Sequence, residues 1–458
     1  MTQNRQTLHR NRCSTQEFLF SQTDTREDDP MSDSGRSDVS LISAGLDELL
    51  KEFPDILSGK SFADAAMDRL RSSSKFGAMA VRIDSFSAAP ETEEEREERE
   101  ECAADILLDV ARAIDSTCNL SDASRGMWGI GHGVLGCFFP EEDEISCMEL
   151  ADTIRKNLAK IREETVTIGI ALYPLIQFGK SQILENACKA LDHAAFSGPG
   201  STAVFDAVSL NISGDKLYQK GHVHEAVEEF EKALLIDPSN VNVHNSLGVC
   251  YGVLGFYKKA FEEFKTAIRL NNNEIMAIYN AGLINLFMGN RDNALKFFLV
   301  AGRLGEDVFE TAFQTGRLYL EMGKPAEGKN FLEKAAELRP ESGAVFRCLG
   351  KCYAALKMRD KAIRSYKKAV KLNPHDSASL SALGYLFDIQ DENPEIATLF
   401  CQHSVEISPE NGLFRHRLGR LYLKQNRLDE ALTEFLKAAE LGHDSHKFIE
   451  EIQKIVDG

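Results

Sequence analysis

The sequence lacks the features that mark membrane-spanning, secreted and nucleic-acid-binding proteins. No apolar run approaches the roughly 20 consecutive residues that a membrane helix needs. The first residues, MTQNRQTLHRNRCSTQEF, contain no apolar core of a secretory signal, and the ten cysteines show no paired spacing. The formal net charge of −18 argues against duplex nucleic acid or an anionic membrane as the main partner. We therefore expect a cytoplasmic protein with reduced thiols.

The sequence also lacks the common motifs of catalysis and metal binding. The patterns G-x-x-x-x-G-K-[ST], H-E-x-x-H and G-x-S-x-G do not occur. His222 and His224 have no matching cysteine or carboxylate pattern, and Cys348 and Cys352 lie one helical turn apart, where core packing explains them. We therefore expect no metal, no cofactor and no catalytic residue.

The chain contains enough apolar material for about three domains, since 43% of its 458 residues are apolar. Its charge is uneven: residues 1–205 carry −15 and residues 206–458 carry −3. Residues 1–40 are polar and predict a disordered tail, and residues 41–75 have apolar positions at helical spacing, which predicts a helical lead-in. The run Glu91–Glu101 predicts a solvated acidic helix, with attraction of a partner as the alternative.

A 34-residue repeat fills the C-terminal half of the chain. A glycine recurs every 34 residues, with one step of 35, at Gly214, Gly248, Gly282, Gly316, Gly350, Gly384 and Gly419. In six of the seven units a small residue follows after twelve positions and an alanine after nineteen, and a large residue such as Phe264 or Phe400 follows after sixteen; prolines such as Pro238 close several units. This spacing predicts paired helices that cross at the small residues, with the proline ending the second helix. One pair cannot bury its apolar face alone, so we expect stacked pairs.

The pattern LGVCY…A…F…A…DP resembles the tetratricopeptide repeat. The resemblance implies an all-α superhelical solenoid of seven repeats over residues 207–445, starting near residues 207, 241, 275, 309, 343, 377 and 412. Residues 446–458 are amphipathic and predict a helix that caps the last repeat. An extra residue in the segment Asp391–Pro394 predicts a bent or loosened joint in the sixth repeat.

In tetratricopeptide repeats, five positions of each first helix line a concave groove that binds a peptide or a protein. Carried over by register, these groove positions hold Asn242, Asn245, Met276, Tyr279, Leu283, Phe287, Phe313, Arg317, Arg347, Lys351, His416, Arg420 and Lys424. The resemblance thus implies a groove that is apolar in the middle and basic towards the C-terminus, which suits a peptide with apolar anchors and acidic residues. The plainer interpretation is that these are ordinary solvated positions. No repeat has the lysine–asparagine pair with which some members hold a C-terminal carboxylate.

Residues 76–205 have a mixed pattern of strands and helices. The expected elements are strand 78–84, helix 98–114, a hairpin of 127–130 and 134–139, helix 147–161, strand 165–173, helix 181–196 and strand 202–205. This order predicts an α+β sandwich with helices packed over one sheet.

Four segments of this region resemble the GGDEF nucleotidyl-cyclase domain. They are RIDSF (Arg82–Phe86) for its D-x-D-x-F strand end, Trp128–Pro140 for its signature hairpin, TVTIGIA (Thr165–Ala171) for its T-V-S-I-G-V-A strand, and Ala187–Gly200 for its last helix. The pairing of this domain with the repeats suggests a bacterial signalling protein.

The residues that the cyclase reaction needs are missing from these segments. Such a cyclase holds Mg²⁺ with two carboxylates, because the metal neutralises charge on the reacting phosphate. Arg82 stands where the first carboxylate is expected, and the signature hairpin reads Gly-His-Gly-Val-Leu from Gly131 to Leu135. Ala195 and Pro199 replace the phosphate-binding lysine and arginine, and an R-x-x-D inhibition motif is absent. Asp105 matches a guanine-contacting position, although a lone aspartate on a helix is usually just solvated.

We therefore expect a non-catalytic adaptor that holds a partner in the groove, with a degenerate cyclase-like domain as a docking or regulatory module. A nucleotide- or cyclic-di-GMP-sensing protein is the alternative from another class. An active diguanylate cyclase is contradicted by Arg82 and Val134.

Overall fold

The computed structural model describes residues 48–87, 93–119, 127–131, 134–175, 177–305, 308–391 and 393–457. The predicted disordered tail, residues 1–40, lies outside this range. The chain divides into two compact units, one ending at Ala277 and the other beginning at Ile278. The division falls within the third repeat and not near residue 206, where the sequence predicts the end of the first folded region.

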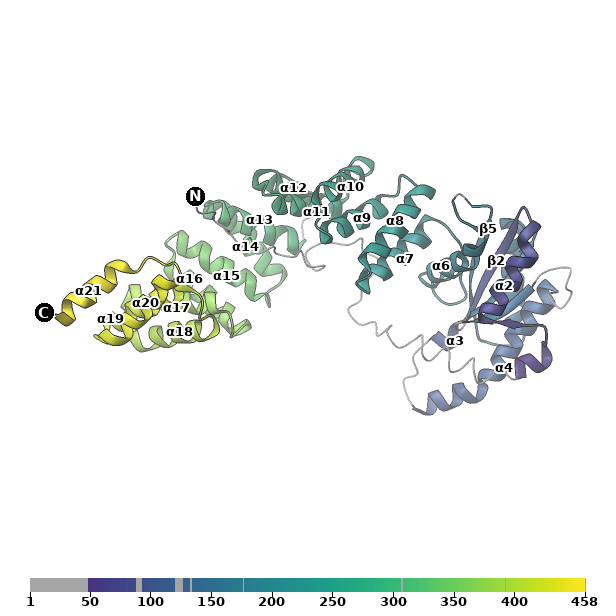
Figure 1. The fold of residues 1–458 in the computed structure, drawn as a ribbon, viewed down its shortest axis with the longest axis horizontal. Coiled ribbons are helices and arrows are strands. Elements are labelled where there is room, and N and C mark those ends of the chain that lie inside the picture. Colours follow the sequence, from purple (N-terminus) through teal and green to yellow (C-terminus); the bar gives the residue numbers. More distant parts are fainter. Residues whose placement is uncertain are drawn as a thin grey trace, which may run out of the picture. The chain divides into compact units, whose positions relative to one another are not determined.

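The N-terminal unit contains a six-stranded sheet in the order β1-β3-β4-β2-β5-β6 (Figure 1). The strands are β1 (Leu57–Ser58), β2 (Phe76–Ile83), β3 (Met127–Gly131), β4 (Val134–Pro140), β5 (Val166–Tyr173) and β6 (Thr202–Val204). The four inner strands pair antiparallel, and β1 and β6 join the two edges in parallel to β3 and β5. The predicted strands and helices between residues 76 and 204 occur in the predicted order, and the short helices α3 (Asp84–Ser87) and η3 (Lys180–Gln182) are additional.

Helices cover both faces of this sheet. On one face, Met79 and Val81 of β2 join a core with α4 (Glu93–Cys118) and α5 (Glu144–Leu158). The other face of the sheet is covered by α2 (Gly59–Arg69) and α6 (Ile183–Ala195). Strand β5 approaches α6 so closely that a Cβ on Gly169 would collide with the α6 backbone. Side chains alternate between the faces of a strand, so the small residues of the second face admit these helices. The layers are therefore helix, sheet, helix.

The predicted helical lead-in, residues 41–75, is only partly helical. Residues 48–52 form one turn, β1 follows, and α2 and the 3₁₀ turn η2 (Leu70–Ser72) complete the segment. Two residues of β1 pair with Gly129 and Ile130 of β3, so the segment adds an edge strand to the sheet. The strand was missed because two residues carry no periodicity.

Fourteen paired helices, α7 to α20, follow the sheet. Their bounds are Ala207–Gln219, Val223–Ile236, Val241–Val253, Tyr257–Leu270, Ile275–Phe287, Arg291–Leu304, Phe309–Glu321, Pro325–Leu338, Gly343–Ala355, Arg359–Leu372, Ser377–Gln390, Pro394–Ile407, Gly412–Lys424 and Leu428–Glu440. Each first helix begins at the residue where the sequence predicts a repeat start. The amphipathic end segment forms α21 (His446–Asp457), which packs against α20.

The recurring glycine makes room for the large residue of its own repeat. A Cβ on Gly248 would lie 2.6 Å from the ring of Phe264, and both residues are buried. The sequence predicts that the paired helices cross at the small residues, and at Gly248 the space is filled by the aromatic ring of Phe264. In the sixth repeat the extra residue shifts this pairing, because Cys401, and not Phe400, faces Gly384. Asp391 and Asn393 absorb the extra residue in left-handed conformations.

Helix α6 belongs both to the sheet domain and to the first repeat. Helix α6 packs on β5 and β2. It also packs on α7, in the way that the second helix of one repeat, such as α8, packs on the first helix of the next repeat, α9. Ion pairs link Lys189 of α6 to the buried Glu229 of α8 (2.8 Å) and Asp192 of α6 to Lys216 of α7 (2.9 Å). These contacts explain why the chain shows no division near residue 206.

Candidate functional site

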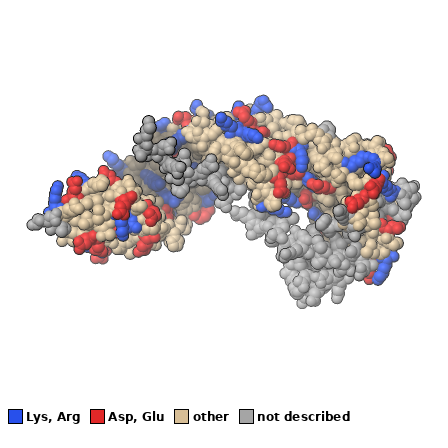
Figure 2. Space-filling model, viewed as in Figure 1, with Lys and Arg blue, Asp and Glu red and all other residues tan. Residues whose placement is uncertain are grey.

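The first helices of consecutive repeats lie next to one another, α7 by α9 in the N-terminal unit and α13, α15, α17 and α19 in sequence in the other. We call the surface that the groove positions of α13, α15, α17 and α19 share in the second unit the first-helix face. Side chains of both charges are interspersed over the surface seen in Figure 2.

The structure places the thirteen predicted groove residues at different depths. Asn242, Lys351 and Lys424 are exposed, and Met276, Phe287, Phe313, Arg317, Arg347, His416 and Arg420 are half-buried. Asn245, Tyr279 and Leu283 are buried at 1–2% exposure, and the Tyr279 ring lies 5.4 Å from that of Phe298. These three residues serve the core and are not available to a partner in this structure.

The first-helix face contains an aromatic cluster in the fourth repeat. Phe309 and Phe313 of α13 stack with ring centroids 5.8 Å apart. The guanidinium of Arg339 lies 3.8 Å from the Phe309 centroid, and that of Arg317 lies 6.0 Å from the Phe313 centroid. The predicted apolar character is therefore present at Phe313, where half-exposed aromatic surface is held in place by neighbouring charges.

The predicted basic end of the groove is largely neutralised within the protein. Asp388 of α17 is 3% exposed in its side chain and pairs with Arg420 (3.1 Å) and Lys424 (2.7 Å) of α19. Arg347 lies 3.4 Å from the buried Asp376. Asp388 occupies a groove position of the sixth repeat. The list of predicted groove residues contains none from that repeat, so the neutralisation of Arg420 and Lys424 by Asp388 was not predicted.

His416 is a further correction, since the C-terminal helix covers it. Its Nδ1 lies 2.8 Å from Ser445 Oγ, and its ring contacts those of Phe435, His443 and Phe448. Burial, with repulsion from His443, lowers the pKa of His416 to about 4. A neutral, packed imidazole belongs to the cap and not to a binding surface.

Three residues on or beside the first-helix face are not among the predicted groove residues. Arg417 of α19 donates a hydrogen bond to the buried Ser381 Oγ (3.0 Å), and its guanidinium lies 4.8 Å from the Tyr385 centroid. Ser381 and Tyr385 occupy groove positions of the sixth repeat. The 34-residue register would have identified Ser381 and Tyr385 as groove residues. It would not have identified Arg417, which lies at a position outside the groove set.

The first two repeats hold a carboxyl group in the seam between their first helices. Asp215 of α7 accepts hydrogen bonds from Ser246 Oγ of α9 (3.2 Å) and from Asn211 Nδ2 (3.3 Å). Among the described residues no cation pairs with it. Burial raises the pKa of Asp215 to about 7. This burial could not be predicted from the sequence, because Asp215 stands in an ordinary helical pattern.

The end of strand β2 is occupied by internal contacts. Arg82 lies 3.8 Å from Asp192 of α6. Asp84 accepts hydrogen bonds from Thr165 Oγ1 (2.6 Å), Thr167 Oγ1 (2.5 Å) and the backbone N–H of Gly200 (2.8 Å). The carboxylate thus joins the start of β5 to the loop before β6.

Asp105 is the one further carboxylate among the cyclase positions named above, and its side chain is described. Asp105 is exposed on α4, and the predicted hairpin residues 132 and 133 and the segment 122–125 lie outside the described residues. No group of three or more potential metal ligands is present in the described part of the chain.

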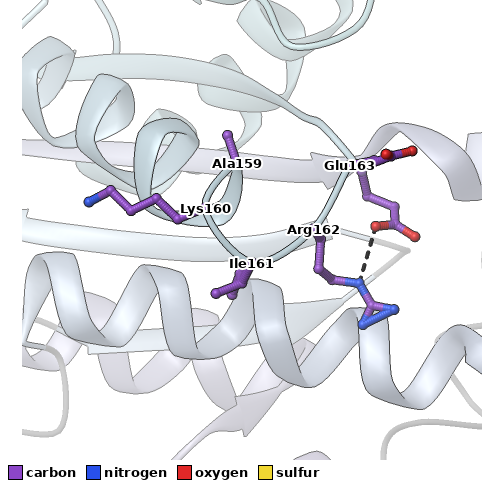
Figure 3. A pocket seen from close by; sticks show the side chains of 6 residues that line it. Ala159, Lys160, Ile161, Arg162 and Glu163 are labelled. Atoms are coloured by element: carbon purple, nitrogen blue, oxygen red, sulfur yellow. Dashed lines mark hydrogen bonds and ion pairs between the residues drawn. The ribbon is translucent and has the colours of Figure 1, made fainter.

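A shallow pocket lies on the loop after α5, lined by Ala159, Lys160, Ile161, Arg162, Glu163 and Glu164 (Figure 3). Arg162 pairs with Glu164 (3.1 Å) and with Asp109 of α4 (2.8 Å). The charge of Arg162 is therefore neutralised within the protein, whereas Lys160 donates, among the described residues, only to the neutral Asn157 Oδ1 (2.9 Å). In the described residues, no helix is both long and apolar enough to cross a bilayer.

Comparison with known proteins identifies the repeats. Residues 214–255 match the family described as TPR repeat, and residues 309–342, 343–376 and 414–441 match families described as tetratricopeptide repeat. The chain therefore contains tetratricopeptide repeats, which generally mediate protein–protein interactions. These matches all lie beyond residue 213 and give no support to the cyclase resemblance. No curated protein matches the chain.

Several solved structures are similar over the repeats. PilF from Pseudomonas aeruginosa is 20% identical, with 46% of this chain and 95% of PilF covered and a TM-score of 0.42. YrrB, described as a TPR protein with an unusual peptide-binding site, is 19% identical, with 42% and 97% covered and a TM-score of 0.39. A tetratricopeptide repeat protein from Parabacteroides merdae is 17% identical, with 55% and 99% covered and a TM-score of 0.40.

Proposed function

We propose that this protein is a non-catalytic adaptor of the cytoplasm whose first-helix face binds a segment of a partner protein. Tetratricopeptide repeats supply the class of activity. The observation that carries the proposal is the half-buried Phe313, which stacks on Phe309 beside Arg317 in the fourth repeat. A rigid aromatic side chain in this setting is a typical anchor for a peptide side chain.

Selection of a phage-displayed dodecapeptide library against the intact protein tests the proposal. The affinity of the selected peptides is then measured by fluorescence polarisation on the intact protein and on Phe313→Ala. Loss of the anchor should weaken binding about five- to thirty-fold, equivalent to about 1–2 kcal/mol. Phe256→Ala is the matched control, because Phe256 is 51% exposed in the turn before α10, away from the predicted groove. Equal losses in the two variants, or a library without binders, would refute binding at this face.

In the same proposal, the sheet domain is a degenerate relative of the GGDEF cyclases that serves docking or regulation. The strand order and the internal use of Asp84 support this part: the carboxylate that remains in the D-x-D segment already accepts three hydrogen bonds. Arg82 brings a positive charge to the place of the other carboxylate. Calorimetry with GTP and Mg²⁺ should give no heat, and synthesis of a cyclic dinucleotide would refute a non-catalytic role.

A nucleotide-sensing function is the second candidate, because the cyclase-like segments could bind GTP or cyclic di-GMP without reacting. Calorimetry with cyclic di-GMP decides between the two candidates. A saturable heat at micromolar concentration would favour the sensor, and its absence favours the adaptor.

A further inference from the structure

The outward side of α16, a second helix, carries a cluster of exposed cations. We call this cluster the α16 basic face; it consists of Lys361, Arg364, Lys367, Lys368 and Lys371. Their spacing places them on the side of the helix away from the buried Ala362, Tyr366 and Ala369. None of the five forms an ion pair with a residue that the structure describes. Asp360, in the first turn, is the one carboxylate of this helix.

The other second helices hold both charges at the equivalent positions. One repeat earlier, α14 has Glu327, Asn330, Glu333, Lys334 and Glu337 there, and two repeats later α20 has Glu430, Thr433, Leu436, Lys437 and Glu440. Like charges three and four residues apart on a helix repel one another and destabilise it. The concentration of cations on α16 therefore brings no stability to the isolated protein.

Three of the ammonium groups of the α16 basic face are held against aromatic rings. Lys368 Nζ lies 3.9 Å from the ring centroid of Phe346, Lys361 Nζ lies 5.5 Å from that of Tyr353, and Lys367 Nζ lies 5.4 Å from that of Phe387. The three rings are 7–9% exposed. These contacts orient the ammonium groups and leave their charge available.

The next second helix, α18, continues this surface with apolar side chains. Ile396 and Leu399 occupy the positions of Lys361 and Arg364 one repeat later, and they are 45% and 62% exposed. Helix α17 packs on both α16 and α18, so the outward sides of these two helices lie on the same side of the array. A cationic strip therefore borders an apolar strip.

We propose that the α16 basic face, together with Ile396 and Leu399, binds an acidic amphipathic helix of a partner protein. The surface is formed by second helices, so the inference goes beyond the proposed function and gives the adaptor a second docking site. The cations of α16 span about 15 Å along the helix axis, and carboxylates at the same spacing on a partner helix have the same rise. Apolar residues beside those carboxylates cover Ile396 and Leu399.

Two other polyanions fit this surface less well. Single-stranded nucleic acid is usually held by bases that stack on aromatic rings, and the rings beside these cations are buried. An anionic membrane is flat and would also meet the exposed Glu327 and Glu337 on the outward side of α14. A single helix lies along α16 and α18 without facing these carboxylates.

The experiment selects helices on the intact protein from a library displayed on a small helical scaffold, with Glu, Lys, Leu and Ala mixed at the outer positions. Fluorescence polarisation then measures the affinity of the selected helices. Clones with glutamates three and four residues apart, beside leucines, should be enriched. The triple variant Lys361→Gln/Lys367→Gln/Lys371→Gln should bind them at least tenfold more weakly, and Ile396→Ser/Leu399→Ser at least threefold more weakly.

The matched control removes three cations from the equivalent positions of α10. In that helix Glu262 lies between the cations and pairs with Lys265 (3.0 Å). The variant Lys259→Gln/Lys265→Gln/Arg269→Gln should therefore bind the selected helices within twofold of the wild type. All replaced side chains are exposed, and equal melting temperatures verify that the variants fold.

Four results would overturn the proposal. They are a library without binders, selected helices without an acidic preference, equal losses in the α16 and α10 variants, and tighter binding of an oligouridylate RNA or of phosphatidylserine vesicles that the α16 variant loses. Phe313→Ala separates this site from the first-helix face and should bind the selected helices as the wild type does. A loss in Phe313→Ala would place the helices on the first-helix face, which overturns this inference and leaves the proposed function intact.

Discussion

Replacing Asp215 by asparagine should stabilise the protein, and more so at alkaline than at acidic pH. Asp215 lies between α7 and α9 with Ser246 and Asn211 as its partners and no cation among the described residues. An asparagine has nearly the same shape, and its oxygen can still accept the hydrogen bond from Ser246. The substitution therefore removes the charge with little change in packing.

The size of the effect follows from the pKa. Burial raises the pKa of Asp215 from 3.8 to about 7, so the folded chain keeps this proton over a range in which the unfolded chain loses it. The folded state then binds more protons, and its stability falls as the pH rises from about 4 to 7. At 1.36 kcal/mol for each pKa unit, the full cost above pH 7 is about 4 kcal/mol at most. Below pH 4 both states are protonated and the cost vanishes.

Urea denaturation of the wild type and Asp215→Asn at pH 4, 6 and 8 measures this difference. The gain in unfolding free energy should be close to zero at pH 4 and about 2–4 kcal/mol at pH 8. Asp292→Asn on the exposed start of α12 is the control and should change stability little at any of these pH values. A pH-independent difference, or a destabilised Asp215→Asn, would refute the reasoning, because it would mean that a cation compensates the charge.

Three further predictions concern packing, protonation and the sheet domain. Gly248→Ala should cost about 1–3 kcal/mol of unfolding free energy in urea, because the new methyl group would collide with the ring of Phe264. The pKa of His416 is lowered to about 4, so its contribution to stability is present above pH 6.5 and is lost as the pH falls towards 4; His416→Asn should flatten the melting temperature over this window. Asp84→Ala should cost about 2–4 kcal/mol, since the N–H of Gly200 and two threonine hydroxyls lose their acceptor, whereas Mg²⁺ should leave the melting temperature of the wild type unchanged.

The sequence predicted where helices begin more accurately than which side chains reach the surface. The repeat starts follow from contacts within one repeat, such as that of Gly248 with Phe264, and these contacts have a fixed spacing in the chain. The exposure of a groove side chain depends on the side chains that neighbouring repeats place around it. Tyr279 occupies a groove position but is 1% exposed, and Phe313 occupies the same position one repeat later and is half-buried.

The charge of the candidate site was harder to predict, because ion pairs join residues that are far apart in the sequence. Arg420 and Lys424 are four residues apart on one helix and suggested a basic surface, but Asp388 lies more than thirty residues before them. Arg417 was missed for the opposite reason: its register position belongs to the packing side, and only the reach of its side chain brings it to Ser381.

Helix α6 packs on both the sheet and the first repeat, and this determines where a stable fragment of the protein can begin. Ala187, Leu191 and Ala194 repeat the spacing of Ala226, Phe230 and Ala233, so α6 is half a repeat whose outer side rests on β5 and β2. The sheet thus closes the front of the array, in the place where a terminal repeat with a polar outer side would otherwise be required. A fragment that starts at residue 206 would uncover α7 and leave Glu229 without Lys189, so an expression boundary upstream of residue 48 is the sound choice.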